Sequence, residues 1–131
     1  MPTIRILVVD DAAVQSRVMA QLLGPYGQCD YAADGIEAVA SFQKAITDDN
    51  KPYQLVCMDS NIPRMDGLEA LRRIREIEKN ANFAPARRAK ILMTTARNDP
   101  ENVMTALKNN CDGYILKPIN QDVLRQKIKE F

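Results

Sequence analysis

The sequence predicts an α/β fold: a doubly wound parallel sheet with helices on both faces. One observation is that short apolar runs alternate with longer segments whose apolar residues recur every three or four positions, which indicates strands alternating with helices. Another is the count of five strand-like runs and five helix-like segments, since strict alternation requires crossover connections between parallel strands. The length of 131 residues suits one core, so we expect residues 1–131 to form one domain.

The first strand and helix show the pattern clearly. Ile4–Val9 is apolar apart from Arg5, as expected for a strand buried on both faces. Ala12–Leu23 is predicted to be helical, because its apolar residues recur at four-residue steps and Gly24-Pro25 follows as a terminator. These apolar residues are Val14, Val18 and Leu22.

The second and third pairs repeat this pattern. A short strand is expected near Gln28–Ala32, followed by a helix at Gly35–Thr47. The third strand is Tyr53–Met58, and its helix runs from Gly67 to about Lys79. The residues expected to face inward are Val39, Phe42 and Ile46 in the first of these helices and Leu68, Leu71, Ile74 and Ile77 in the second.

The last two pairs follow a long connection, Asn80–Ala89. We interpret it as a solvated loop, with partner contact through Arg87-Arg88 as the alternative. The predicted elements are a strand at Lys90–Thr95, a helix from Asp99-Pro100 to about Asn110, a strand at Gly113–Leu116, and a helix at Gln121–Phe131 with Val123, Leu124 and Ile128 inward. An aspartate at the N-cap and a proline in the first turn favour a helix start at Asp99-Pro100.

Composition excludes several classes of protein. Lys plus Arg (18) nearly balances Asp plus Glu (17), so no global field would attract nucleic acid or a membrane surface. The three cysteines Cys29, Cys57 and Cys111 are odd in number and widely spaced, which favours reduced thiols and a cytoplasmic protein. No apolar run is long enough to span a membrane. Because the chain has no histidine, its chemistry must use carboxylates, hydroxyls and lysine.

Five polar residues stand at the expected carboxyl ends of the strands. They are Asp10 and Asp11 after the first strand, Asp59 after the third, Thr95 after the fourth and Lys117 after the fifth. In doubly wound sheets, ligands bind beyond these ends. We therefore expect the functional site at this edge.

The three aspartates predict a metal site. Carboxylates gathered at one edge would repel each other and raise each other's pKa unless a cation neutralised them. Oxygen ligands without cysteine or histidine suit Mg²⁺ best, with Mn²⁺ as a substitute. The alternative for Asp10 and Asp11 is that one caps the first helix and the other is solvated.

Asp59 has the position expected of a nucleophile. The polar loop that follows it is expected to leave its carboxylate exposed, and a carboxylate can attack phosphorus to give an acyl phosphate. Lys117 would supply a cation and Thr95 a hydroxyl, and strand alternation lets only one of Thr94 and Thr95 face the site. Tyr114 would lie beside Thr95 if their strands are neighbours, the alternative being a half-buried core tyrosine.

Taken together, these residues resemble the receiver domain of two-component response regulators over Ile4–Phe131. The motifs are Val8-Val9-Asp10-Asp11, Met58-Asp59, Pro63-Arg64-Met65-Asp66-Gly67, Thr95-Ala96 and Gly113-Tyr114-Ile115-Leu116-Lys117-Pro118. The resemblance implies a flavodoxin-like fold of strand order 2-1-3-4-5 and a cytoplasmic phosphoprotein that accepts a phosphoryl group on Asp59. It further implies a protein that is not an enzyme, but that takes part in its own phosphorylation and dephosphorylation.

The resemblance also implies a metal-ligand set. Asp11 and Asp59 would bind Mg²⁺ directly, Asp10 would bind it through water, and the backbone carbonyl of Asn61 would complete the protein ligands. Asn61 and Arg97 would modulate the rate at which water removes the phosphate. Ile62 departs from the methionine usual in the family.

Further implied roles concern the switch. Lys117 would pair with the phosphoryl oxygens, Thr95 would hydrogen-bond one of them, and Lys117-Pro118 would be a cis peptide bond at Pro118. Thr95 and Tyr114 would move together and reshape the face made by the fourth helix, fifth strand and fifth helix. The partners implied are a histidine kinase or histidine phosphotransfer protein and a downstream target protein at that face, with no nucleic acid and no membrane.

Three hypotheses follow. The first is a stand-alone receiver of the chemotaxis type that acts as a phosphorylation-gated binding module. The second is a receiver belonging to a longer regulator with a DNA-binding or catalytic output domain. The third is a phosphatase of the haloacid dehalogenase type, which the adjacency of Asp10 and Asp11 disfavours, because that family spaces its two aspartates two residues apart.

Overall fold

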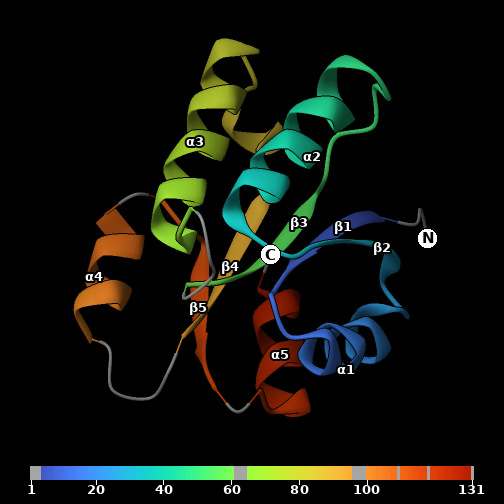
Figure 1. Cartoon of the computed structure of the whole chain (residues 1–131), viewed down its shortest axis with the longest axis vertical. Coiled ribbons are helices and arrows are strands. Elements are labelled where there is room, and N and C mark those ends of the chain that lie inside the picture. The colour runs from blue at the N-terminus through green and yellow to red at the C-terminus, as the bar shows by residue number, and fades with distance from the viewer. Residues whose placement is uncertain (1–3, 61–64, 96–99, 109, 118, 131) are drawn as a thin grey trace.

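The computed structural model describes residues 4–60, 65–95, 100–108, 110–117 and 119–130 and shows a parallel sheet with helices on both faces (Figure 1). The strands are β1 (Ile4–Val9), β2 (Gly27–Ala32), β3 (Leu55–Asp59), β4 (Lys90–Thr95) and β5 (Gly113–Leu116), in the order β2-β1-β3-β4-β5. The helices are α1 (Ala13–Leu23), α2 (Gly35–Thr47), α3 (Gly67–Asn80), α4 (Pro100–Lys108) and α5 (Gln121–Lys129), with a short 3-10 turn, η1 (Pro85–Arg87). The predicted fold class and strand order are confirmed.

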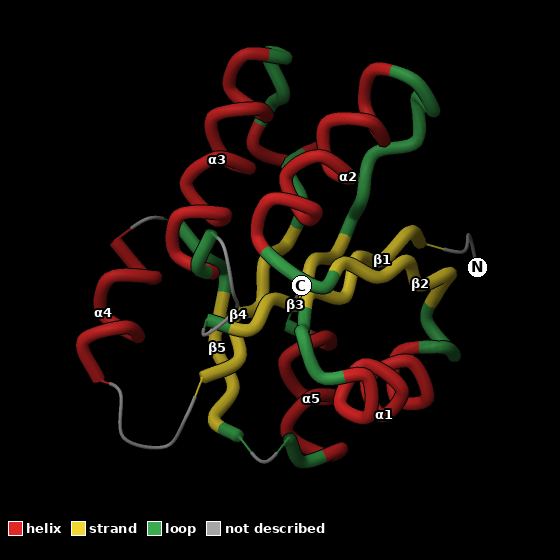
Figure 2. Tube along the Cα trace, in the orientation of Figure 1, coloured by secondary structure: helices red, strands yellow, loops and turns green. Residues whose placement is uncertain are grey.

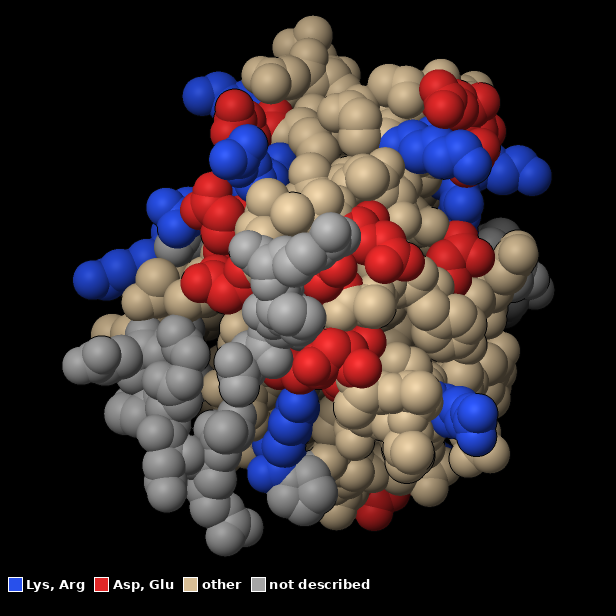
Figure 3. Space-filling model, in the orientation of Figure 1, with Lys and Arg blue, Asp and Glu red and all other residues tan. Residues whose placement is uncertain are grey.

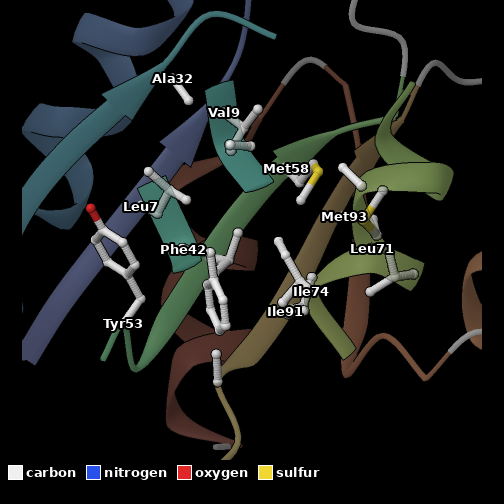
Figure 4. Close-up of a cluster of buried hydrophobic side chains, with 14 of the residues drawn as sticks. Leu7, Val9, Ala32, Phe42, Tyr53, Met58, Leu71, Ile74, Ile91 and Met93 are labelled. Atoms are coloured by element: carbon white, nitrogen blue, oxygen red, sulfur yellow. The ribbon is translucent and has the colours of Figure 1, made fainter. Parts of the chain in front are cut away.

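The helices divide between the two faces of the sheet. Helices α2, α3 and α4 cover one face and α1 and α5 cover the other (Figure 2). Successive strand residues point to opposite faces, so each inner strand contributes to both cores. On β1, Leu7 and Val9 join the core under α2 and α3, whereas Ile6 and Val8 join the core under α1 and α5. Figure 4 shows the first of these cores packed from both the sheet and the helices.

Several predicted bounds hold without change. The bounds of β1, β4, β5 and α2 are those predicted from the sequence. By contrast, β3 begins at Leu55 and ends at Asp59, so Asp59 is the last residue of the strand and pairs in register with Thr94. The site residue is therefore held by the sheet ladder rather than by a loop.

The apolar spacing of α1 marks the side that packs only in part, since its last member, Leu22, packs against the core. Val14 is 73% exposed and Val18 is 38% exposed, whereas Met19 and Leu23 are buried. A four-residue spacing defines a stripe without fixing which way the helix is rotated against the sheet. The inward placement of Val123 in α5 is wrong for the same reason, since this residue is 44% exposed and its neighbour in sequence, Leu124, is buried.

A buried ionic network joins α3 to the starts of β4 and β5. The carboxylate of Glu78 is fully buried, accepts a hydrogen bond from Arg75 at 2.7 Å, and accepts another from the backbone N–H of Ala89 at 2.6 Å. Arg75 also donates to Asp112 at 2.8 Å, and the same Asp112 oxygen accepts from the backbone of Ile91. The connection that we predicted to be a solvated loop therefore ends in a fixed anchor.

No helix in the described ranges is long and apolar enough to cross a membrane.

Candidate functional site

Three carboxylates meet at the carboxyl edge of the sheet. One oxygen from each of Asp10, Asp11 and Asp59 lies within 4.8 Å of the other two. Asp10 and Asp59 are buried, with 7% and 4% of their surface exposed, and Asp11 is exposed. Figure 3 shows acidic side chains gathered on this side of the molecule. The oxygen-only donor set fits Mg²⁺, because hard divalent cations take carboxylate oxygens and keep several waters.

Lys117 supplies the cation. Its Nζ donates to Asp59 Oδ2 at 2.7 Å and lies 4.0 Å from Asp10 Oδ2. The backbone N–H of Lys117 donates to the carbonyl of Thr95 at 2.8 Å, which extends the β4–β5 ladder by one step past Leu116. The pairing of β4 with β5 therefore positions the side chain of Lys117 beside the carboxylates.

The expected exposure of Asp59 is wrong. Its side chain is only 5% exposed, because Lys117 lies over one oxygen and the chain returns across the strand end at Gly67. A Cβ atom at Gly67 would lie 2.4 Å from the carbonyl oxygen of Asp59. Gly67 is thus a site residue that the sequence reasoning missed. In the sequence, Gly67 directly follows Asp66, the N-cap of α3, and this position indicates only a role in starting the helix.

Asp10 is subject to opposing electrostatic effects. Burial raises the pKa of its carboxyl group, and the nearby Asp59 and Asp11 raise it further. A hydrogen bond of 2.9 Å from the N–H of Ala12 and the charge of Lys117 oppose these effects. The N-cap of α1 is Ala12, with no side-chain cap, so neither aspartate occupies the N-cap of that helix.

Thr95 presents an unsatisfied hydroxyl. The residue is 2% exposed, and its Oγ1 has no hydrogen-bond partner within the described ranges. Buried hydroxyl groups nearly always have a partner, and leaving one unpaired costs on the order of 1–3 kcal/mol. A ligand oxygen that accepted this hydrogen bond would recover that cost.

Tyr114 lies near Thr95 but not beside it. The sheet register pairs Tyr114 with Met93, and Thr95 with Leu116. Alternation puts Tyr114 and Thr95 on the same face, offset along the sheet by about 7 Å. Tyr114 is partly buried and packs against the core under α2 and α3, which matches the alternative of a half-buried core tyrosine. Three further predicted residues, Asn61, Arg97 and Pro118, lie outside the described residues.

Comparison with known proteins identifies the family. A sequence model described as "Response regulator receiver domain" matches residues 6–129. The chain belongs to the response regulator receiver domain family. The receiver domains it resembles are signalling proteins, and the oxygen-lined cluster of aspartates is compatible with Mg²⁺ binding.

Curated relatives of this receiver domain include chemotaxis proteins. The chain is 34% identical over 126 residues to the chemotaxis protein CheY of Treponema pallidum, covering 95% of this chain and 79% of that protein. It is 32% identical over 128 residues to a chemotaxis protein CheY homolog of Campylobacter jejuni, covering 96% of this chain and 90% of that one.

Solved structures of receiver domains superpose over nearly the whole chain. The receiver domain of Saccharomyces cerevisiae Ssk1, crystallised with the histidine phosphotransfer protein Ypd1, has a TM-score of 0.83 at 28% identity, covering 98% of this chain and 88% of that one. A Borrelia burgdorferi CheY, in a complex with CheX, BeF3 and magnesium, has a TM-score of 0.81 at 26% identity, covering 99% of this chain and 89% of that one.

Proposed function

We propose that this receiver domain accepts a phosphoryl group on Asp59 from a phosphohistidine of a histidine kinase or histidine phosphotransfer protein. The observation that carries the proposal is the 2.7 Å contact between Lys117 Nζ and Asp59 Oδ2 inside a cluster of three carboxylates. A cation and a metal-binding carboxylate set around one buried aspartate are what transfer of a phosphoryl group to a carboxylate requires.

The chain's own residues have distinct parts in this reaction. A carboxylate oxygen of Asp59 forms the new P–O bond while the P–N bond to the donor imidazole breaks, and the departing imidazole keeps the electron pair and takes up a proton. Lys117 exchanges its contact with the carboxylate for one with a phosphoryl oxygen. The hydroxyl of Thr95 donates to another phosphoryl oxygen and so gains a partner that it does not have among the described residues.

Asp10, Asp11 and Asp59 would hold Mg²⁺, with the carbonyl of Asn61 as a further proposed ligand and Mn²⁺ as a substitute ion. When bound, the ion supplies positive charge to the transferring group, and it relieves the repulsion among the carboxylates. Thermal unfolding tests this part of the proposal. Mg²⁺ should raise the Tm of the protein, and Asp11→Asn should abolish the rise, whereas Asp48→Asn, an exposed substitution outside the cluster, should leave it intact.

Two surfaces suit the two proposed partners. On the first, Ala13, Arg17 and Ala20 of α1 line a cleft of about 600 Å³ together with Asp10 and Asp11, and this side suits the phosphoryl donor because it adjoins the carboxylate cluster. The second surface lies on α4, β5 and α5, where exposed apolar residues gather: Met104, Leu107, Leu116 and Val123. We assign this second surface to the downstream target, with Thr95 and Tyr114 transmitting the change.

The phosphotransfer proposal is tested by incubating the protein with acetyl phosphate and Mg²⁺ and measuring its intact mass. One phosphoryl group should be added, and it should be absent after chelation of the metal and in Asp59→Asn. Asp48→Asn serves as the matched control. An unchanged mass for the native protein, or an equal gain in Asp59→Asn, contradicts the proposal.

A stand-alone receiver and a receiver within a longer regulator would give the same result in this assay. The haloacid dehalogenase alternative has no support from the family match.

A further inference from the structure

A polar cavity lies at the opposite edge of the sheet from Asp59. It is an open pocket of about 990 Å³ at the amino ends of β1, β3 and β4, bordered by the α2–β3 connection and by η1. The amino end of β1 and the α2–β3 connection lie on the right in Figure 1. None of the residues that line this pocket belongs to the proposed phosphoacceptor site.

The pocket is strongly basic, although the whole chain is nearly neutral. Its lining includes five cations and one carboxylate, Asp49, and the cations are Arg5, Lys51, Arg87, Arg88 and Lys90. The formal charge of the lining is therefore +4, against +1 for the whole chain. Such a concentration of one sign produces a local field that the net charge does not reveal.

Arg5 is already occupied by the fold. Its guanidinium donates to Asp30 at 3.1 Å, to Asp49 at 3.2 Å and to the carbonyl of Lys51 at 2.8 Å. It also lies 4.6 Å from the centre of the Tyr53 ring. Arg5 and Asp49 thus neutralise each other at the back of the pocket and fix the α2–β3 connection in place.

The other four cations have no such partners. Lys51, Arg87, Arg88 and Lys90 are all exposed, and none forms an ion pair with a carboxylate in the part of the chain described. Arg87 is held against the ring of Phe83 at 4.7 Å, which directs one cation without neutralising it. Four cations around one pocket repel each other, and an anionic ligand would relieve that repulsion.

The form of the pocket favours a protein segment over a small molecule or a nucleic acid. Small-molecule sites bury most of the ligand among apolar groups, whereas these cations stand exposed around an open pocket. Base recognition uses exposed aromatic rings, but Tyr53, the aromatic residue of the lining, is 3% exposed. Exposed charges on long side chains suit an interface in which complementary charge steers association.

We propose that this basic pocket docks an acidic segment of a partner protein, at a site separate from the phosphoacceptor edge. The proposal does not rest on phosphorylation of Asp59, since the two sites lie at opposite ends of the strands. It gives the receiver a tethering contact that leaves the α1 surface and the α4–β5–α5 surface accessible.

The test is a titration of the full chain with an oligoglutamate peptide, followed by NMR chemical shifts of the backbone amides at low and high salt. A peptide of the same length made of glutamine is the uncharged control. The variant is Lys51→Glu/Arg88→Glu, because neither side chain makes a contact among the described residues that the fold needs. Arg125→Glu/Lys129→Glu on α5 is the matched control with the same change in net charge.

The expected result is a set of shift changes confined to residues that line the pocket, present with oligoglutamate, absent with oligoglutamine, and weakened by salt. Affinity should fall about tenfold in Lys51→Glu/Arg88→Glu, and should change much less in the α5 control. Asp59→Asn should bind the peptide as the native protein does, which separates this test from the phosphotransfer assay. Equal loss in both double variants, or binding of inorganic triphosphate in the pocket without binding of the peptide, would overturn the proposal.

Discussion

Lys117 Nζ lies 2.7 Å from Asp59 Oδ2, so the residue that ends β3 is paired with the residue that follows β5, across the intervening strand β4. The pairing joins residues 58 positions apart in the sequence. It places a cation beside a carboxylate that is only 5% exposed, at the point where a phosphoryl group would arrive.

Replacing this cation should impair phosphoryl acceptance more than folding. In Lys117→Met, no cation opposes the charge that develops on the transferring group, so the rate of phosphorylation by acetyl phosphate should fall roughly a hundredfold. The rate is followed by intact mass at fixed Mg²⁺. Lys129→Met, an exposed lysine on α5, is the control and should react at the native rate. A native rate in Lys117→Met would remove the lysine from the mechanism.

Thr95 allows stability and reactivity to be separated. Because its buried hydroxyl has no partner among the described residues, Thr95→Val removes an unsatisfied group and keeps the shape of the side chain. The free energy of unfolding in urea should stay the same or rise by about 1 kcal/mol, while phosphorylation slows. A loss of stability would show that the hydroxyl has a structural partner, and native kinetics would show that the phosphoryl group does not use it.

The fold could be predicted because strand and helix alternation is a local property, and because parallel sheets bring all carboxyl ends to one edge. Asp10, Asp11, Asp59 and Lys117 were therefore placed together without any knowledge of contacts. Properties that depend on packing were not predictable. Helix rotation misled the placement of Val123, and the burial of Asp59 depends on Lys117 and Gly67, which approach from other parts of the chain.

Alkaline pH should weaken the fold through a buried thiol. Burial raises the pKa of Cys57 from 9.0 to about 12. Between these values the unfolded chain has lost the thiol proton and the folded chain keeps it, so the free energy of unfolding falls as the pH rises above about 9. The slope contributed by this group is about 1.4 kcal/mol per pH unit. Urea unfolding at several pH values should give a shallower slope in Cys57→Ala than in the native protein.

The contribution of Tyr53 to the alkaline pH dependence must be measured separately from that of Cys57, since burial and the hydrogen bond to Asp30 also raise the pKa of the Tyr53 phenol. Tyr53→Phe alone should reduce the slope at the most alkaline end only. If the Tyr53→Phe variant and the Tyr53→Phe/Cys57→Ala double variant have equal slopes, the thiol contributes nothing to the pH dependence.

The ionic network of α3 should be among the most sensitive points of the structure. Glu78 is fully buried and is held by Arg75 and by the N–H of Ala89, so Glu78→Ala removes one acceptor of the largely buried Arg75 guanidinium and leaves the buried amide of Ala89 without its acceptor. Breaking one partner of a buried ion pair costs about 3–5 kcal/mol, and the free energy of unfolding should fall by that order. Glu76→Ala, an exposed substitution on the same helix, should change it by less than about 0.5 kcal/mol.

Because Arg75 also holds Asp112 just before β5, Glu78→Ala should increase amide hydrogen exchange at Ile91 and Gly113 before the whole domain unfolds. Similar stability losses in the two variants would mean that the network does not anchor β4 and β5.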